Sequence, residues 1–190
     1  NNHPLTTSII QELIPHLPNH GYLDEDKLFM TDRYYNALVE AWKVPSDGLG
    51  AIGSDEWLQY FLTGDGGASD LLVRIDGVSQ DRDAAKVHFS TDELFEDKDF
   101  RIRFVDVLPS SAGLRKHQME LEYSSSKNRW VISNLDNPLA ELEEYPVEMR
   151  KYFASDEWMQ DVKYAIEESS PEGIEYIQES VRAVNEYLNQ

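Results

Sequence analysis

The sequence predicts an α+β fold, with N-terminal helices packed on a curved antiparallel sheet of four to five strands and a helical C-terminal segment. Three observations predict it. Apolar residues recur at helical spacing in the first 70 positions, alternate with polar residues between Leu71 and Leu135, and return to helical spacing after Asn137-Pro138. Helical spacing gathers apolar side chains on one helix face, whereas alternation gathers them on one strand face. We expect an α+β domain over residues 1–137 and a helical extension, 138–190, packed on it.

Three helices are expected before the sheet. One carries Tyr35, Leu38 and Trp42 at helical spacing, and Pro45 lies just beyond its end. Another begins at Ser54, a residue type that caps helix N-termini. The expected ranges are 5–17, 31–43 and 54–63.

Five segments have the alternation of strands. Leu71, Val73 and Ile75, for example, are separated by single residues that would lie on the opposite face. Because only one face of each strand is mainly apolar, the sheet needs a covering element on that face. The expected ranges are 71–78, 84–90, 100–108, 117–124 and 129–135.

The third and fourth strands are expected to form a hairpin. A turn centred between Ser111 and Ala112 gives a register in which both faces are complementary. Apolar pairs then share the buried face and opposite charges share the other, and such cross-strand pairs stabilise a register. The pairs are Phe100–Tyr123, Ile102–Leu121, Phe104–Met119, Arg101–Glu122 and Arg103–Glu120.

The same register places Asp106 opposite His117, at the open end of the apolar face. A carboxylate beside an imidazole fixes its tautomer and favours its charged form, so the two residues are candidates for acid–base catalysis. Two other interpretations remain open. A purely structural ion pair would give the same pattern in the sequence. Alternatively, a bulge between Val105 and Val107 would turn Asp106 to solvent.

Two helix starts are expected in the C-terminal segment. Ser155 precedes Asp156-Glu157, and Ser170 precedes Pro171-Glu172, so each offers a capping hydroxyl followed by acidic residues in the first turn. The stretch from Ser155 to Gln160 resembles the stretch from Ser54 to Gln59. The likeness does not extend further on either side, which indicates two similar helix starts rather than a duplicated domain.

The composition is strongly acidic. The chain has 36 acidic and 17 basic residues, for a net charge of −19, and residues 136–190 contribute 14 acids and 4 bases, or −10. This charge disfavours nucleic acid and anionic lipid as partners and would attract a basic protein. The alternative is that acidic helix surfaces only keep the protein soluble.

No motif in the sequence indicates a metal or a cofactor. Cysteine is absent, the acidic clusters lack the spacing of an EF-hand loop, and no lysine follows the glycines at 64–67 as in a phosphate-binding loop. No apolar run approaches the roughly 18 residues that cross a bilayer, so membrane insertion is not expected. The start at Asn1, without Met, favours removal of a leader and a periplasmic or cell-surface location, and a trimmed chain is the alternative.

Helices followed by a curved sheet that ends in Trp130-Val131-Ile132-Ser133-Asn134 resemble the nuclear-transport-factor-2-like, cystatin-like superfamily. The Tyr34–Trp42 helix followed by Ser54–Leu58 resembles bacterial domains of that shape whose function is uncharacterised. The resemblance implies a cone-shaped interior that can bind small molecules and, in some members, holds an acid or a His. We expect Phe104, Met119, Tyr123 and Trp130 to line such a pocket. The acidic helical C-terminus departs from the superfamily pattern.

The leading functional hypothesis is a non-catalytic binding or protein-interaction domain, because the sequence shows no convergent catalytic set. Its partner would be a basic protein or a small molecule. A more specific version is an acidic immunity-type protein that neutralises a basic toxin. The alternative class is a small cone-fold enzyme that uses Asp106 and His117 in acid–base chemistry.

Overall fold

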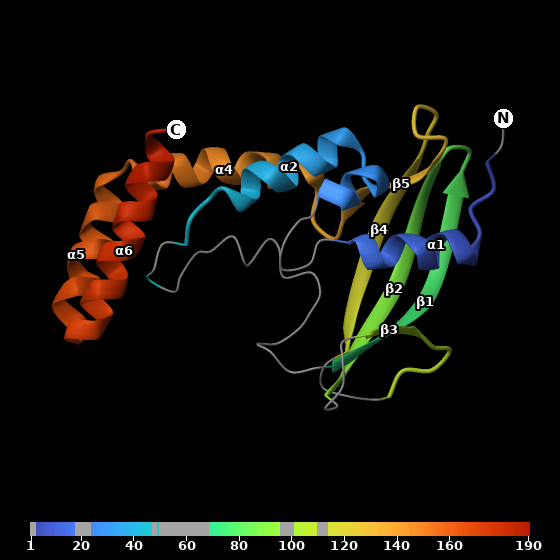
Figure 1. Ribbon diagram of the computed structural model, residues 1–190, viewed down its shortest axis with the longest axis horizontal. Helices are drawn as coiled ribbons and strands as arrows, with labels where there is room; N and C mark the ends of the chain where they lie inside the picture. Colours follow the sequence, from blue (N-terminus) through green and yellow to red (C-terminus); the bar gives the residue numbers. More distant parts are fainter. Residues whose placement is uncertain (1–2, 18–23, 47–48, 50–68, 96–100, 110–113) are drawn as a thin grey trace. The chain divides into compact units, whose positions relative to one another are not determined.

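The computed structural model describes residues 3–17, 24–46, 49, 69–95, 101–109 and 114–190 (Figure 1). The chain divides into two compact units, the first formed by Asn1–Tyr35 with Tyr60–Pro138 and the second by Asn36–Gln59 with Leu139–Gln190. Of the described residues, 36–46 and 49 fall in the second unit. The expected helix 54–63 lies outside the described residues.

The first unit is built on a five-stranded curled sheet, which confirms the α+β class. Its strands follow the spatial order β3-β1-β2-β4-β5. Three neighbouring pairs are antiparallel, whereas β3 runs parallel to β1, so the sheet is mixed. The strands are β1 (Ser69–Asp81), β2 (Ala84–Phe95), β3 (Arg101–Phe104), β4 (Arg115–Ser124) and β5 (Arg129–Leu135).

The predicted hairpin between the third and fourth strands is wrong. β4 lies between β2 and β5, while β3 lies at the far edge beside β1. The positive charges of β3 find another partner, because Asp70 of β1 accepts hydrogen bonds from Arg103 Nη1 at 2.9 Å and Arg101 Nε at 3.3 Å. Glu120 of β4 forms its ion pair with Lys86 of β2, at 3.2 Å. The charge pattern is thus satisfied in a different strand order.

Two bulges help to curl the sheet. One interrupts β1 between Ile75 and Gly77, and the other shifts the β4–β5 register after Glu120. A bulge bends its strand and increases the local twist. At the first bulge, the Asp76 carboxylate accepts hydrogen bonds from Ser90 and from Arg74 Nε, the latter at 2.7 Å. Although burial opposes ionisation of this carboxyl, these donors lower the pKa of Asp76.

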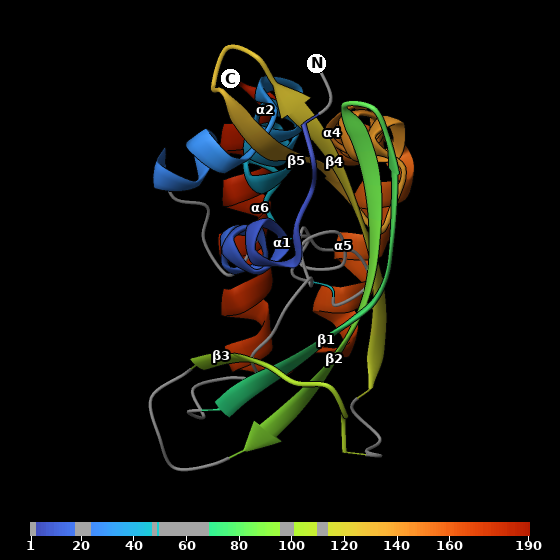
Figure 2. The ribbon, with the colours of Figure 1, turned by 90° about the vertical axis from the view of Figure 1, so that its right-hand side faces the viewer.

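Short helices of the N-terminal segment cover one face of the sheet. α1 (Thr7–Leu13) continues as the 3₁₀ turn η1 (Ile14–His16). α1 lies across the strands in Figure 1 and to one side of the sheet in Figure 2. Thr6 caps α1 by accepting a hydrogen bond from the Ile9 backbone N–H. The core beneath consists of side chains at most 2% exposed, among them Ile10, Leu13, Val73, Val87, Phe89, Met119, Leu121 and Ile132.

The next part of the N-terminal segment attaches to the edge of β5. The 3₁₀ helix η2 (Asp24–Phe29) precedes an isolated parallel bridge between Met30 and Ile132, and then α2 (Asp32–Trp42) begins. Lys127, beside β5, donates hydrogen bonds to the Met30 carbonyl at 2.6 Å and to the Asp32 carboxylate at 3.1 Å. These contacts fix the N-terminal segment against the β4–β5 hairpin.

Three C-terminal helices of the second unit pack on one another: α4 (Leu139–Phe153), α5 (Asp156–Glu168) and α6 (Pro171–Leu188). The predicted caps are present, with Ser155 accepting from Trp158 N and Ser170 accepting from Gly173 N, each at 3.3 Å. The buried ring of Phe153 meets the rings of Trp158 and Tyr187, each edge to face. Across the described part of the chain, no helix is long and apolar enough to cross a membrane.

Candidate functional site

The structure places the two candidate catalytic residues apart. His117 is a buried residue of β4, whereas Asp106 follows the edge strand β3 and is exposed. The carboxylate that contacts His117 belongs to Asp136, with Oδ2 2.8 Å from Nδ1. The expected pairing of Asp106 with His117 is therefore not formed, because β3 is not a neighbour of β4.

His117 also contacts a hydroxyl on its other side. Its Nε2 lies 3.1 Å from Thr91 Oγ1, so hydroxyl, imidazole and carboxylate follow one another as in an activated nucleophile. However, Thr91 is 3% exposed and His117 is 8% exposed, so the hydroxyl is enclosed. The arrangement ties β2 and β4 to the end of β5, which is a structural role.

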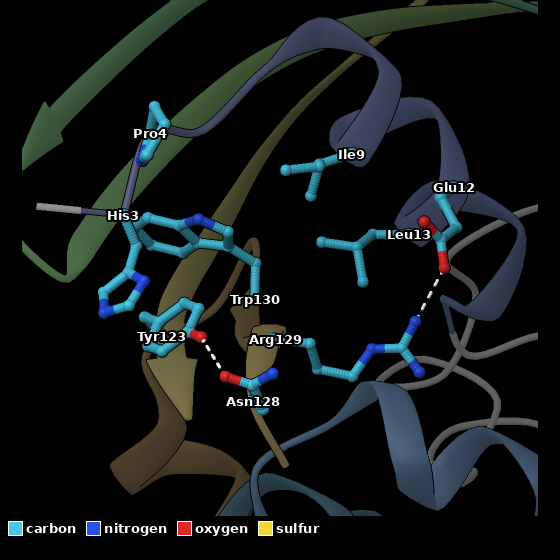
Figure 3. Close-up of a pocket in the computed structure, with 9 residues that line it drawn as sticks. All are labelled: His3, Pro4, Ile9, Glu12, Leu13, Tyr123, Asn128, Arg129 and Trp130. Carbon is cyan, nitrogen blue, oxygen red and sulfur yellow. Dashed lines mark hydrogen bonds and ion pairs between the residues drawn. The ribbon is translucent and has the colours of Figure 1, made fainter. Parts of the chain in front are cut away.

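A better candidate site is a pocket of about 250 Å³ in the first unit (Figure 3). It lies between the N-terminal segment with α1 and the hairpin of β4 and β5. Of the four residues expected to line a pocket, Tyr123 and Trp130 do so. Met119 is fully buried, and Phe104 lies on the edge strand β3, which β1 and β2 separate from β4. The lining residues are His3, Pro4, Ile9, Glu12, Leu13, Tyr123, Asn128, Arg129 and Trp130.

One wall of the pocket is aromatic. The imidazole of His3 stacks on the ring of Tyr123, with centroids 3.5 Å apart and planes 8° from parallel. Trp130 meets Tyr123 edge to face at 6.0 Å, since the two residues are cross-strand partners in β4 and β5. The Tyr123 hydroxyl donates to Asn128 Oδ1 at 2.8 Å (Figure 3). The rings are thus held in place by their neighbours.

The opposite wall carries an ion pair. Arg129 Nη2 lies 2.6 Å from Glu12 Oε1, joining β5 to α1 (Figure 3). The Arg129 guanidinium also lies over the Phe29 ring, 4.3 Å from its centroid. Arg129 is therefore held on one side by a carboxylate and on another by an aromatic face.

Trp130 brings a buried polar atom to the pocket. Trp130 is only 3% exposed. Among the described residues, no acceptor lies within hydrogen-bond reach of its indole Nε1. Figure 3 shows the indole beside His3, with its nitrogen on the ring edge turned away from Tyr123 and toward the side of Pro4 and Ile9. A buried indole N–H usually has an acceptor, and leaving a buried donor unsatisfied costs about 1–3 kcal/mol.

Gln80 attaches the N-terminal segment to the sheet beside the pocket. Its side-chain oxygen accepts from Leu5 N at 3.0 Å, and its side-chain nitrogen donates to the His3 carbonyl at 2.8 Å. These two bonds fix the backbone on both sides of Pro4. Sequence reasoning missed this residue, because a single Gln near a strand end gives no signal of a distant partner.

A second pocket, of about 360 Å³, lies beside the β1–β2 hairpin and β4. The charged groups Lys86 and Glu120 on its wall pair with each other. Among its lining residues, none carries a buried polar atom without a hydrogen bond in the part of the chain that is described. The pocket at Trp130 is therefore the stronger candidate. The described residues also contain no cluster of three or more side chains suited to a metal ion.

Comparisons of the chain with protein-family models, curated proteins and solved structures give no match. The function assigned to the pocket therefore rests on its geometry and chemistry.

Proposed function

We propose that this protein is a non-catalytic binding domain that holds a small molecule in the pocket between α1 and the β4–β5 hairpin. The observation that carries the proposal is the buried, unpartnered indole N–H of Trp130 at the pocket wall. A small-molecule site typically combines an apolar, aromatic lining with a few polar groups that orient the ligand. The aromatic wall, the Arg129–Glu12 pair and the Trp130 donor supply this combination.

Ligand-observed NMR tests the proposal with four small aromatic probes: benzamide, benzoate, benzylamine and toluene. We expect saturation transfer from the protein to at least one probe, and loss of that signal in Ile9→Trp, which fills the pocket from α1. Val107→Trp is the matched control, because Val107 is 77% exposed and does not line the pocket. Absence of binding by all four probes, or equal loss in both variants, would contradict the proposal.

A second candidate function concerns the second unit. Its α5 and α6 expose the tyrosines Tyr164 (67%) and Tyr176 (57%) among acidic residues. Exposed aromatic rings within a field of one sign are suited to contact a partner of opposite charge. We propose a basic protein as this partner. Hen lysozyme as a basic probe should bind more weakly to the double variant Tyr164→Ser, Tyr176→Ser, and equal binding would count against this function.

A further inference from the structure

The chemistry of the pocket also indicates which class of molecule it holds. If the proposed small-molecule function holds, the lining limits three properties of the ligand: its hydrogen-bonding groups, its charge and its shape. Each follows from a different set of lining residues.

The ligand must supply a hydrogen-bond acceptor. Trp130 Nε1 can only donate, and it has no acceptor among the described residues. The other polar contacts at this wall are already formed, since the Tyr123 hydroxyl donates to Asn128. A carbonyl or amide oxygen placed against the indole would satisfy the buried donor that this wall leaves open among the described residues.

The ligand is expected to carry no net charge. Arg129 and Glu12, the Arg and Glu side chains of the lining, neutralise each other at 2.6 Å. An anion would compete with Glu12 for Arg129, and a cation would compete with Arg129 for Glu12. Either ligand would lose its own hydration without gaining a free counter-charge.

The ligand is expected to be flat and small. The stacked rings of His3 and Tyr123, together with Trp130, form planar surfaces, and Ile9 and Leu13 of α1 add apolar surface beside the ion pair. Planar groups pack well against aromatic faces. The volume of about 250 Å³ lies below the roughly 300–1,000 Å³ of sites for drug-sized ligands, so one ring with a short substituent fits the space.

We infer that the pocket binds a small uncharged aromatic molecule through a carbonyl or amide oxygen that accepts from Trp130 Nε1. The four probes separate the required properties. Benzamide has the ring and the neutral acceptor, benzoate adds negative charge, benzylamine carries positive charge without an acceptor, and toluene has only the ring.

Dissociation constants measured by NMR titration of the full chain test the inference. Benzamide should bind roughly three- to tenfold more tightly than toluene, as expected for one net hydrogen bond, and more tightly than both charged probes. In Trp130→Phe, the ratio of the toluene to the benzamide dissociation constant should fall to about one. Comparing ratios isolates the N–H, because the space opened by the substitution affects both probes.

The outcomes are distinguishable from failure of the proposed function. If none of the probes binds, the proposed function itself is wrong. If toluene, benzoate or benzylamine binds as tightly as benzamide, the pocket binds small molecules but the assigned ligand class is wrong. Should Trp130→Phe fail to fold, the wild-type chain still decides, because the Trp130 indole proton must shift downfield with benzamide and not with toluene.

Discussion

Asp136 holds the imidazole of His117 in place, with Oδ2 2.8 Å from Nδ1. The other oxygen of Asp136 accepts from the Gln118 backbone N–H, also at 2.8 Å. Asp136 has a positive φ of 55°, so the chain turns sharply where β5 ends and the carboxylate faces back onto β4. The contact joins the end of β5 to a buried residue of β4.

The first prediction follows from this contact. Asp136→Ala leaves the His117 ring nitrogen and the Gln118 N–H without their acceptor, so we expect a loss of about 1–3 kcal/mol in the free energy of unfolding. Asp106→Ala is the control. Because Asp106 is exposed, its change should stay within roughly 0.5 kcal/mol. Urea denaturation measures both, and a larger loss in Asp106→Ala would contradict the observed pairing.

The second prediction concerns acid stability. The hydrogen bond from Arg103 is the largest influence on Asp70 and, despite the opposing effect of burial, the pKa of this carboxyl lies below its ordinary value of 3.8. A lowered folded-state pKa stabilises the fold above the unfolded-state pKa, and this contribution disappears as pH falls through the folded-state value. The free energy of unfolding should therefore decrease as pH falls below about 4.

Asp70→Asn separates this carboxyl from the others. The variant should be less stable than the wild type at neutral pH, and the difference should shrink on acidification. Thermal unfolding of both proteins, at pH values from neutral to below about 4, measures the difference in stability. A difference that stays constant over this range would show that Asp70 does not contribute through its ionised form.

The third prediction concerns the charge balance of the pocket. Glu12→Gln removes the carboxylate partner of Arg129 and leaves the guanidinium uncompensated. Benzoate should then gain about two- to fivefold in affinity relative to benzamide, because the pair is partly exposed and its strength is modest. Glu40→Gln, which breaks the comparable surface pair with Lys43, is the control and should leave the ratio unchanged. An unchanged ratio in Glu12→Gln would mean that Arg129 does not influence the ligand.

The fourth prediction concerns the N-terminal wall. Gln80→Ala removes both side-chain bonds to residues 3–5, so the stacked His3 should lose its fixed position. We expect benzamide affinity to fall several-fold while the free energy of unfolding changes by less than about 1 kcal/mol. Ser79→Ala, at the neighbouring exposed position, is the control. Equal affinities in the two variants would remove the assigned role of Gln80.

Local signals predicted the elements whose boundaries depend on local chemistry. The caps at Ser155 and Ser170 and the strand 129–135 lie where expected, since a capping hydroxyl or an alternating run needs no distant partner. Strand neighbours were not predictable in this way. Arg101 suits Glu122 as well as Asp70, so charge complementarity alone could not decide whether β3 pairs with β4 or β1.

The site shows the same limit. The superfamily resemblance led to the expectation that Tyr123 and Trp130 line a pocket, and the two cross-strand partners do line one. His3 and Glu12 come from a segment more than a hundred residues away and reach the pocket through tertiary contacts. His117 does contact a carboxylate, but that of Asp136 and not that of Asp106. The order of the strands, which the alternation of residues does not reveal, decides which acid lies beside His117.

The most direct test of the pocket is the indole N–H resonance of Trp130 in a ¹⁵N-labelled protein, recorded while benzamide is added. The chain has four Trp residues, so the resonance is assigned by its disappearance in Trp130→Phe or by elimination with single Trp→Phe variants of the other three. The Trp130 proton should move downfield in a saturable manner, while the indole resonances of Trp42 and Trp158, which do not line the pocket, stay in place. A Trp130 resonance that does not respond to benzamide, or that shifts equally with toluene, would contradict the assigned donor.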